Sequence, residues 1–293
     1  MSTTTTAAMD STSAASNAAA PRSPVTLRTI QNMVKQGEKF ACLTCYDAIT
    51  ARWLERAGVP ILLIGDTAAE MVLGLPGTIH APLDLLIMLT AAVKRGAPAT
   101  LVMGDMPFMS YQADDREALH NAGRFMTEGM ADAVKLEVDH TFVDLVGKMA
   151  RAGVPVVAHL GCLPQQVMRQ GGYRTAGRTA AEANDMVEAA RRMEDAGAVM
   201  LLIEATPTEV SKRIVEQTSI PVIGCGAGPD CHGQIVVLQD LLGLTDWQPS
   251  FASPLVQLGN DLVSAAQRWM ENVRTSSLGE HPYRMRDGES DRF

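Results

Sequence analysis

Short aliphatic runs alternate along the chain with longer amphipathic stretches, and this rhythm continues from about residue 40 to residue 226. Continuous apolar runs of this length are typical of strands that are covered on both faces, as in a parallel sheet. The pattern predicts seven strands: Phe40–Cys45, Pro60–Gly65, Ala99–Gly104, Asp132–Glu137, Val154–Gly161, Ala198–Glu204 and Ile220–Gly226. An eighth strand is expected near Ser250–Ala252, where the signal is weaker.

The stretches between these runs have the periodicity and length of amphipathic helices. We predict helices over Asp47–Ala57, Leu83–Arg95, Asp114–Glu128, Thr141–Arg151, Thr179–Asp195, Thr208–Glu216 and Pro254–Val273. Gly58, Gly153 and Gly197 each follow a predicted helix, at the position where a left-handed residue commonly ends it. A helix, a glycine and a strand therefore recur as one unit along a single domain.

This repeated unit predicts an α/β fold, either a closed (β/α)8 TIM barrel or an open doubly wound sheet. No GxGxxG motif follows the first strand, which counts against an open dinucleotide-binding sheet. Seven or eight units in one domain favour the barrel. We expect this catalytic domain to occupy residues 25–275, between a disordered tail at residues 1–24 and a loose tail at residues 276–293.

Composition narrows the class of protein. Hydrophobic residues make up 46% and aromatic residues only 4% of the chain, so its core must be aliphatic. The net charge is −8 and no Lys/Arg cluster is present, which argues against nucleic-acid binding. No apolar run approaches the ~18 residues that cross a membrane, and residues 1–24 lack the apolar segment of a secretory signal. We expect a cytoplasmic protein, with organellar targeting by the N-terminal tail left open.

Five cysteines are present, an odd number with irregular spacing. Cys42 and Cys45 form a CxxC motif, but they fall inside a predicted strand, where residues three apart face opposite sides. We therefore interpret them as structural cysteines rather than as a redox or zinc-binding pair.

An ionisable residue stands at the end of each of five consecutive predicted strands. These residues are Asp66, Asp105, Lys135 with Glu137, His159 and Glu204. In (β/α)8 barrels the C-terminal ends of the strands form the active site. The shared position indicates that these side chains meet at one mouth of the barrel.

The carboxylates of Asp66, Asp105 and Glu137 come from adjacent strands, and oxygen ligands of this kind suit Mg²⁺ or a similar hard cation. Lys135 is two residues from Glu137, so both face the same side and Lys135 is placed to hold a substrate carboxylate. Glu204 is a candidate general base. The alternatives are loop caps for the two aspartates, an internal Lys135–Glu137 ion pair, and a partner of a loop backbone for Glu204.

One residue and two loops have two interpretations each. His159 is either a ligand of the substrate or a hydrogen-bonded core histidine. The segment Gln170–Arg174 contains two glycines and is either a lid or an ordinary loop. The segment Gly224–Pro229 follows the seventh strand, where barrels often bind phosphate, but a tight turn needs glycine as well.

Several motifs match one known family in order and in spacing. They are Leu43–Asp47, Gly65–Thr67, Asp105–Phe108 with Ser110–Tyr111, Ala131–Glu137, His159–Gly161, Gly171–Arg174 with Gly177–Arg178, Glu204, and Gly226–Asp230 with Gly233–Gln234. From about residue 26 to about residue 273, the chain resembles the ketopantoate hydroxymethyltransferase (3-methyl-2-oxobutanoate hydroxymethyltransferase) family.

The resemblance implies a TIM barrel of the phosphoenolpyruvate/pyruvate type. It implies transfer of a hydroxymethyl group from 5,10-methylenetetrahydrofolate to 3-methyl-2-oxobutanoate through an enolate, giving 2-dehydropantoate for pantothenate and coenzyme A biosynthesis. Mg²⁺ would be held by Asp66, Asp105 and, directly or through water, Glu137. The oxo acid would contact Asp66, Thr67, Asp105 and Lys135, and Glu204 would accept the proton. Members are homo-oligomers, commonly decamers.

The chain departs from the family around this chemical core. Thr67 stands where serine is usual, Met88–Thr90 lacks a customary histidine, and His232 replaces an aspartate. These departures keep open a paralogue that acts on another 2-oxo acid. A lyase or mutase of the phosphoenolpyruvate mutase/isocitrate lyase type is less favoured, because the chain has no Lys-Lys-Cys-Gly-His loop. A non-catalytic scaffold is less favoured because no key carboxylate is lost.

Overall fold

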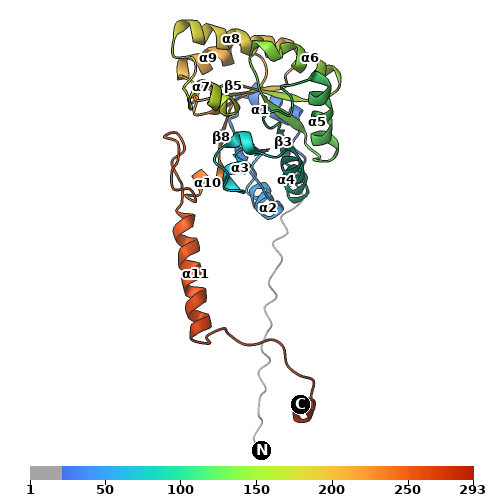
Figure 1. Ribbon diagram of the computed structural model, residues 1–293, viewed down its shortest axis with the longest axis vertical. Helices are drawn as coiled ribbons and strands as arrows, with labels where there is room; N and C mark the ends of the chain where they lie inside the picture. Colours follow the sequence, from blue (N-terminus) through green and yellow to red (C-terminus); the bar gives the residue numbers. More distant parts are fainter. Residues whose placement is uncertain (1–21) are drawn as a thin grey trace, which may run out of the picture.

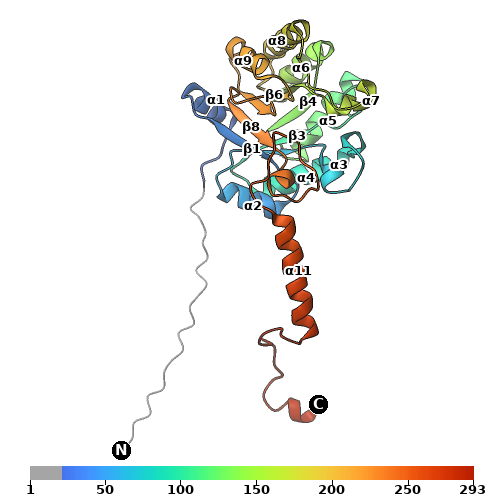
Figure 2. The same cartoon turned by 90° about the vertical axis from the view of Figure 1, so that its left-hand side faces the viewer.

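Eight parallel strands close into a barrel in the computed structural model, which describes residues 22–293 (Figure 1, Figure 2). Each strand pairs with the next along the chain, and the last strand pairs with the first. The strands are β1 (Phe40–Thr44), β2 (Ile61–Ile64), β3 (Leu101–Asp105), β4 (Ala133–Glu137), β5 (Val156–Gly161), β6 (Met200–Glu204), β7 (Val222–Cys225) and β8 (Gly233–Val236). The prediction of a (β/α)8 barrel is confirmed.

The strands separate two apolar layers, because successive side chains of a strand point to opposite faces. On β3, Leu101 and Met103 belong to the cluster that fills the barrel interior, whereas Val102 belongs to the layer between strands and helices. Cys42 and Cys45 are divided between the same two clusters, and both are free thiols. The two side chains therefore face opposite sides of the barrel wall, as the strand pattern predicts.

Most of the helices lie around the barrel wall, between successive strands. The helices are α1 (Leu27–Lys35), α2 (Ala48–Arg56), α3 (Ala68–Met71), α4 (Leu83–Gly96), α5 (Asp115–Thr127), α6 (Val143–Arg151), α7 (Val167–Gln170), α8 (Ala180–Asp195), α9 (Thr208–Gln217), α10 (Leu238–Leu241) and α11 (Leu258–Arg274). Short 3-10 turns are η1 (Thr78–His80), η2 (His140–Phe142), η3 (Pro164–Gln166) and η4 (Ser290–Arg292). The predicted helices between residues 47 and 217 are all present, with ends displaced by up to two residues.

Helix α1 closes the N-terminal end of the barrel. The sequence pattern did not predict this helix, because it lies before the first of the repeated strand–helix units. Ile30 of α1 is fully buried in the interior cluster, and Val25 joins the same cluster just before the helix. The Val25 N–H donates a 2.8 Å hydrogen bond to the carbonyl of Ala99, which precedes β3. The N-terminal end is therefore filled by apolar side chains, which leaves the C-terminal end for polar chemistry.

The eighth strand lies at Gly233–Val236, so the prediction of a strand near Ser250–Ala252 is wrong. β8 has only four residues, begins with glycine and exposes Gln234, so it lacks a continuous apolar run. The segment at 250–252 is instead a turn in which Phe251 packs on Gly226. A Cβ at Gly226 would lie 2.5 Å from the Phe251 ring, so this contact needs glycine.

Helix α11 extends away from the barrel instead of covering it (Figure 1, Figure 2). It begins later than predicted, at Leu258, and none of its residues is buried. Leu262, Trp269 and Val273 lie on one side at helical spacing, and each is more than half exposed. The helix therefore presents an apolar stripe that the described chain does not cover.

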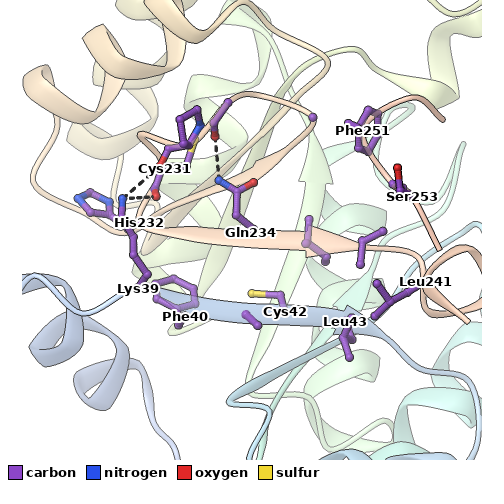
Figure 3. Close-up of a pocket in the computed structure, with 17 residues that line it drawn as sticks. Lys39, Phe40, Cys42, Leu43, Cys231, His232, Gln234, Leu241, Phe251 and Ser253 are labelled. Atoms are coloured by element: carbon purple, nitrogen blue, oxygen red, sulfur yellow. Dashed lines mark hydrogen bonds between the residues drawn. The ribbon is translucent and has the colours of Figure 1, made fainter. Parts of the chain in front are cut away.

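An open groove of about 700 Å³ lies along β1 and β8 (Figure 3). Ala41 and Gln234 are paired in register on these two strands, and both are exposed. At one end of the groove the Lys39 ammonium donates hydrogen bonds to three successive carbonyls, the shortest being 2.7 Å to Cys231 O. Among the described residues, no helix packs on β1 or β8 as closely as α4 packs on β2 and β3.

The disordered N-terminal tail and the loose C-terminal tail remain predictions. Residues 1–21, most of the expected N-terminal tail, lie outside the described residues. Residues 276–293 contain only the short turn η4 and are exposed throughout. No helix within residues 22–293 is long and apolar enough to cross a membrane.

Candidate active site

Charged residues occupy the inward-facing positions next to the C-terminal end of the barrel. On β3, Leu101 and Met103 point into the interior, and the alternation of a strand makes Asp105 the next inward residue. The same phase on the next three strands gives Lys135 and Glu137 on β4, His159 on β5 and Glu204 on β6. The ionisable residues at the strand ends therefore lie directly above an aliphatic interior.

A cavity of about 370 Å³ opens at this end and is lined by six of the seven predicted site residues. They are Asp66, Thr67, Asp105, Lys135, His159 and Glu204. Glu137 is the exception, because it is buried behind this cavity and lines a second one, of about 330 Å³, with Tyr111 and Gln165. The structure thus brings the predicted site together, with Glu137 outside the lining of the main cavity.

Lys135 and Asp105 form a buried ion pair at the centre of the site. The Lys135 Nζ lies 2.7 Å from both carboxylate oxygens of Asp105, and the two residues are register partners on β4 and β3. The Asp66 N–H donates a 3.0 Å hydrogen bond to Asp105 Oδ2. Lys135 is paired with Asp105 rather than with Glu137, so the alternative of an isolated Lys135–Glu137 ion pair is not what the structure shows.

Gln165 connects two of the carboxylates and carries no signal in the sequence. Its Nε2 donates to Asp66 Oδ2 at 2.9 Å, and its backbone N–H donates to Glu137 Oε2 at 3.0 Å. The residue is buried in η3, just beyond the end of β5. An uncharged residue in a loop shows neither periodicity nor a strand-end position, so only the folded chain shows its contacts.

His159 lies between the carboxylates of Glu137 and Glu204. Its Nδ1 is 3.9 Å from Glu137 Oε1, and its Nε2 is 3.4 Å from Glu204 Oε2. The ring is buried, yet neither nitrogen has a hydrogen-bond partner among the described residues. A hydrogen-bonded core histidine is therefore not observed, and both ring nitrogens are buried without a hydrogen-bond partner among the described residues.

The backbone around Glu204 is tightly constrained. Gly161 has a φ of +101°, and a Cβ there would lie 2.3 Å from the Glu204 carbonyl oxygen. Ala205 follows with a φ of +46°, which is rare for a residue with a side chain. The Glu204 side chain is 22% exposed, compared with 2% for Glu137. Glu204 is therefore a carboxylate that a ligand in the cavity can reach.

Burial and mutual repulsion decide the protonation of this site. Burial, followed by the charge of Asp105, raises the pKa of Asp66 to about 8. Burial also raises the pKa of Glu137 well above its usual value, with Lys135 opposing that shift. Burial alone would lower the pKa of Lys135, but Asp105 and its two neighbouring carboxylates outweigh it and hold that pKa above its usual range. Burial lowers the pKa of His159, so its ring is neutral at pH 7.

The charges of the site suit a divalent cation. Three buried carboxylates share one ammonium group, so the fully ionised set carries −3 from the acids and +1 from the lysine, a net charge of −2. Oxygen donors of this kind are the usual ligands of Mg²⁺. Within residues 22–293, however, no three His, Cys, Asp or Glu side chains are already grouped as metal ligands. Joint coordination by Asp66, Asp105 and Glu137 therefore stays a prediction.

Two glycine-containing loops border the cavity. Gly171 and Gly172 have φ values of +71° and +132°, and Tyr173 after them lines the cavity while remaining 61% exposed. In the loop after β7, Gly228 has a φ of +83°, and a Cβ there would lie 2.0 Å from Thr208 Oγ1. Backbone conformation and packing therefore account for that glycine, which favours a tight turn over a phosphate-binding loop.

The fold and the site define this chain as a (β/α)8-barrel protein with an acidic, lysine-containing cavity at its strand ends. A solved structure with a similar fold is 2,3-dimethylmalate lyase, a member of the PEP mutase/isocitrate lyase superfamily (17% identity, 93% of this chain and 95% of that chain, TM-score 0.56). Another is phosphoenolpyruvate phosphomutase from Streptomyces platensis subsp. rosaceus (14% identity, 87% and 92%, TM-score 0.58). At these identities the likeness shows a shared fold.

The sequence gives a closer relationship. The ketopantoate hydroxymethyltransferase family model matches residues 24–281. The 3-methyl-2-oxobutanoate hydroxymethyltransferase of Hyperthermus butylicus is 43% identical over 94% of this chain and 96% of that chain. The enzymes of the same name from Moorella thermoacetica (39%, covering 90% and 98%) and Alkalilimnicola ehrlichii (43%, covering 88% and 93%) are similar to it as well. The chain belongs to the ketopantoate hydroxymethyltransferase family.

Proposed function

We propose that this protein transfers a hydroxymethyl group from 5,10-methylenetetrahydrofolate to 3-methyl-2-oxobutanoate, giving 2-dehydropantoate for pantothenate and coenzyme A biosynthesis. Family membership and relatives of that name at 39% to 43% identity support this activity. The single observation that carries the proposal is the cavity in which Asp66 and the Asp105–Lys135 pair share one lining with the accessible carboxylate of Glu204.

Asp66 and Asp105 would hold a divalent ion such as Mg²⁺, with Glu137 as a ligand directly or through water. When bound, the ion would offset the carboxylate charge and polarise the keto oxygen of the oxo acid as a Lewis acid. Burial, followed by the charge of Asp105, raises the pKa of Asp66, and a bound cation would favour its ionised form against both effects.

Glu204 is the residue placed to remove the proton from C3 of the oxo acid. Glu204 ends β6, Asp66 follows β2 and Asp105 ends β3, and all three line the same cavity. A substrate held by the two aspartates would present its C3 to Glu204. Loss of the proton leaves an enolate, whose negative charge Lys135 stabilises. C3 then forms a bond to the one-carbon unit of 5,10-methylenetetrahydrofolate. Hydrolysis of the remaining carbon–nitrogen bond, with water supplying the hydroxyl, releases 2-dehydropantoate and tetrahydrofolate. Thr67 and His159, in the same lining, are proposed contacts of the oxo acid.

The proposal is tested by incubating the protein with candidate 2-oxo acids, 5,10-methylenetetrahydrofolate and Mg²⁺, with products followed by mass spectrometry. Hydroxymethylated 3-methyl-2-oxobutanoate is the expected main product, and excess chelator should suppress it. Preference for a different 2-oxo acid would identify a paralogue with another substrate. Cleavage of a carbon–carbon bond without folate would instead place the protein among the lyases, and no product from any acid would contradict the proposal.

We also propose that the protein is a homo-oligomer, a decamer as the family resemblance implies. The apolar stripe of α11 (Leu262, Trp269 and Val273) supports this, because water-exposed apolar surface of this extent is typical of an interaction site. The open groove along β1 and β8 is a second uncovered surface on the same chain. Contact with other copies would bury both.

Mass photometry tests the assembly. The unmodified protein should form one multi-subunit species, and Trp269→Lys should shift it toward smaller species, because a charge replaces the apolar centre of the stripe. Trp53→Lys is the matched control, since Trp53 is 62% exposed but lies on α2, beside Arg56. A monomeric unmodified protein would contradict the proposal.

A further inference from the structure

We infer that Gln165 is a positioning residue, which fixes the carboxylates of Asp66 and Glu137 in the arrangement that binds the divalent ion. This inference rests on the proposed function and deepens it, because it concerns how the ion site is held. Gln165 does not itself line the main cavity, so it makes no direct contact with a substrate held there. Its influence would pass through the two carboxylates.

The side-chain amide of Gln165 uses its full hydrogen-bonding capacity. Its Nε2 donates to Asp66 Oδ2 at 2.9 Å and to the Met106 carbonyl at 3.0 Å. Its Oε1 accepts from Gln112 Nε2 at 2.9 Å and lies 3.0 Å from the Tyr111 hydroxyl. A primary amide has two N–H donors and two acceptor sites, so no further partner is needed.

These partners also fix the direction in which the amide points. The Met106 carbonyl, and Asp66 in the ionised form that a bound cation would favour, only accept hydrogen bonds, so they require the NH2 end of Gln165. The Gln112 NH2 group only donates, so it requires the carbonyl end. Exchanging the two ends would set like groups against each other on both sides. Gln165 therefore holds Asp66 Oδ2 from one defined direction.

The backbone of the same residue holds the second carboxylate. The Gln165 N–H lies 3.0 Å from Glu137 Oε2 and 3.3 Å from Oε1. One residue of the turn Pro164–Gln166 thus contacts carboxylates that follow β2 and end β4, on either side of Asp105. The Asp105 carboxylate accepts hydrogen bonds from Lys135 instead. Each of the three carboxylates proposed to hold the ion is therefore oriented by a defined donor.

The Tyr111 hydroxyl contacts both the side chain of Gln165 and the backbone of Glu137. It accepts the Glu137 N–H at 3.1 Å and lies 2.9 Å from the Glu137 carbonyl, so it can give its hydrogen either there or to Gln165 Oε1. Outer hydrogen bonds of this kind orient metal-binding carboxylates. Their loss typically weakens metal binding by about 10- to 100-fold.

Gln165→Met tests the inference, because methionine keeps the length of the side chain and the backbone N–H but removes the amide. Mn²⁺ binding to the whole protein, without oxo acid or folate, is titrated by electron paramagnetic resonance, and circular dichroism confirms the fold. The Kd for Mn²⁺ should rise about 10- to 100-fold. The matched control is Gln166→Met in the same turn, whose amide oxygen accepts from Arg169 instead, and its Kd should not change.

Gln112→Met is the second variant, and it decides the matter if Gln165→Met does not fold. It removes a donor to Gln165 Oε1 but no contact with a carboxylate, so the Mn²⁺ Kd should rise about fivefold, the worth of one net hydrogen bond. An unchanged Kd in a folded Gln165→Met, or in Gln112→Met where the first does not fold, overturns the inference. An unmodified protein that binds no Mn²⁺ would instead contradict the metal site of the proposed function.

Discussion

Acidic side chains at the mouth of this barrel differ in their chemistry because each has a different neighbour. Asp105 lies 2.7 Å from the ammonium of Lys135, which compensates its charge. The Asp66 carboxylate accepts a hydrogen bond from the neutral amide of Gln165, and burial raises its pKa to about 8. Glu204 has neither partner and remains partly accessible. These differences between single residues are the basis on which we propose Asp66 and Asp105 for binding and Glu204 for proton removal.

Glu204→Gln should abolish exchange of the C3 proton of 3-methyl-2-oxobutanoate, because an amide cannot accept that proton. A positioned general base typically contributes about 10²- to 10⁴-fold, and the exchange rate should fall by that factor. Deuterium incorporation in D₂O with Mg²⁺ and without folate is followed by NMR. The control Glu209→Gln, exposed on α9, should exchange normally. Unchanged exchange in Glu204→Gln would remove this residue from the mechanism.

Elements around the barrel meet at glycines where their backbones come too close for a side chain. Helix α4 ends at Gly96, and a Cβ there would lie 2.3 Å from the carbonyl oxygen of Ala48, the first residue of α2. A Cβ at Gly123 on α5 would instead point into open space, with no neighbouring side chain or element within 4 Å, so a methyl group fits there. The two glycines therefore have opposite roles in the packing of elements.

Gly96→Ala should destabilise the fold by about 1–3 kcal/mol, because overpacking forces the two helices apart. Gly123→Ala should instead stabilise it by about 0.5–1 kcal/mol, since alanine favours a helix interior over glycine. Thermal unfolding followed by circular dichroism measures both variants against the unmodified protein. Equal melting temperatures for the two variants would show that the α2–α4 contact is looser than the structure indicates.

At the scale of the whole molecule, the acidic site is a cluster of buried charge above an aliphatic barrel interior. Its stability cost depends on pH through Asp66, whose pKa is about 8 in the fold against an ordinary value of 3.8. Between these two values the folded chain holds a proton that the unfolded chain has lost, so stability falls as pH rises toward about 8. His159, with a lowered pKa, acts in the opposite sense, but only below its ordinary value of 6.5.

The melting temperature in chelator should therefore fall between about pH 7 and pH 8, a window in which His159 is mostly neutral in both states. Mg²⁺ should reduce or abolish this fall, because the ion favours the ionised carboxylates. Differential scanning calorimetry with and without Mg²⁺ makes the comparison, and Asp66→Asn in chelator should show a smaller fall than the unmodified protein. A melting temperature in chelator that rises across this window would contradict the assignment.

The local sequence pattern alone was enough to predict the barrel fold and most of the inward-facing site residues. The repeat of apolar runs, helices and glycines predicts the barrel, and the period of two along β3 places Asp105 inward once Leu101 and Met103 are inward. The same reasoning reaches Lys135 and Glu204. These predictions succeed because each depends on the alternation of side chains within one strand, which neighbouring residues determine.

Only the tertiary structure decided the remaining features. β8 has four residues and no apolar run of its own, so its position depends on pairing with β1 and β7. Gln165 acquires its role because η3 lies against carboxylates that are 99 and 28 residues away along the chain. Helix α11 shows an amphipathic pattern that cannot say which surface it meets. In each case the deciding contacts join residues far apart in the sequence, and such contacts leave no periodic trace in any one segment.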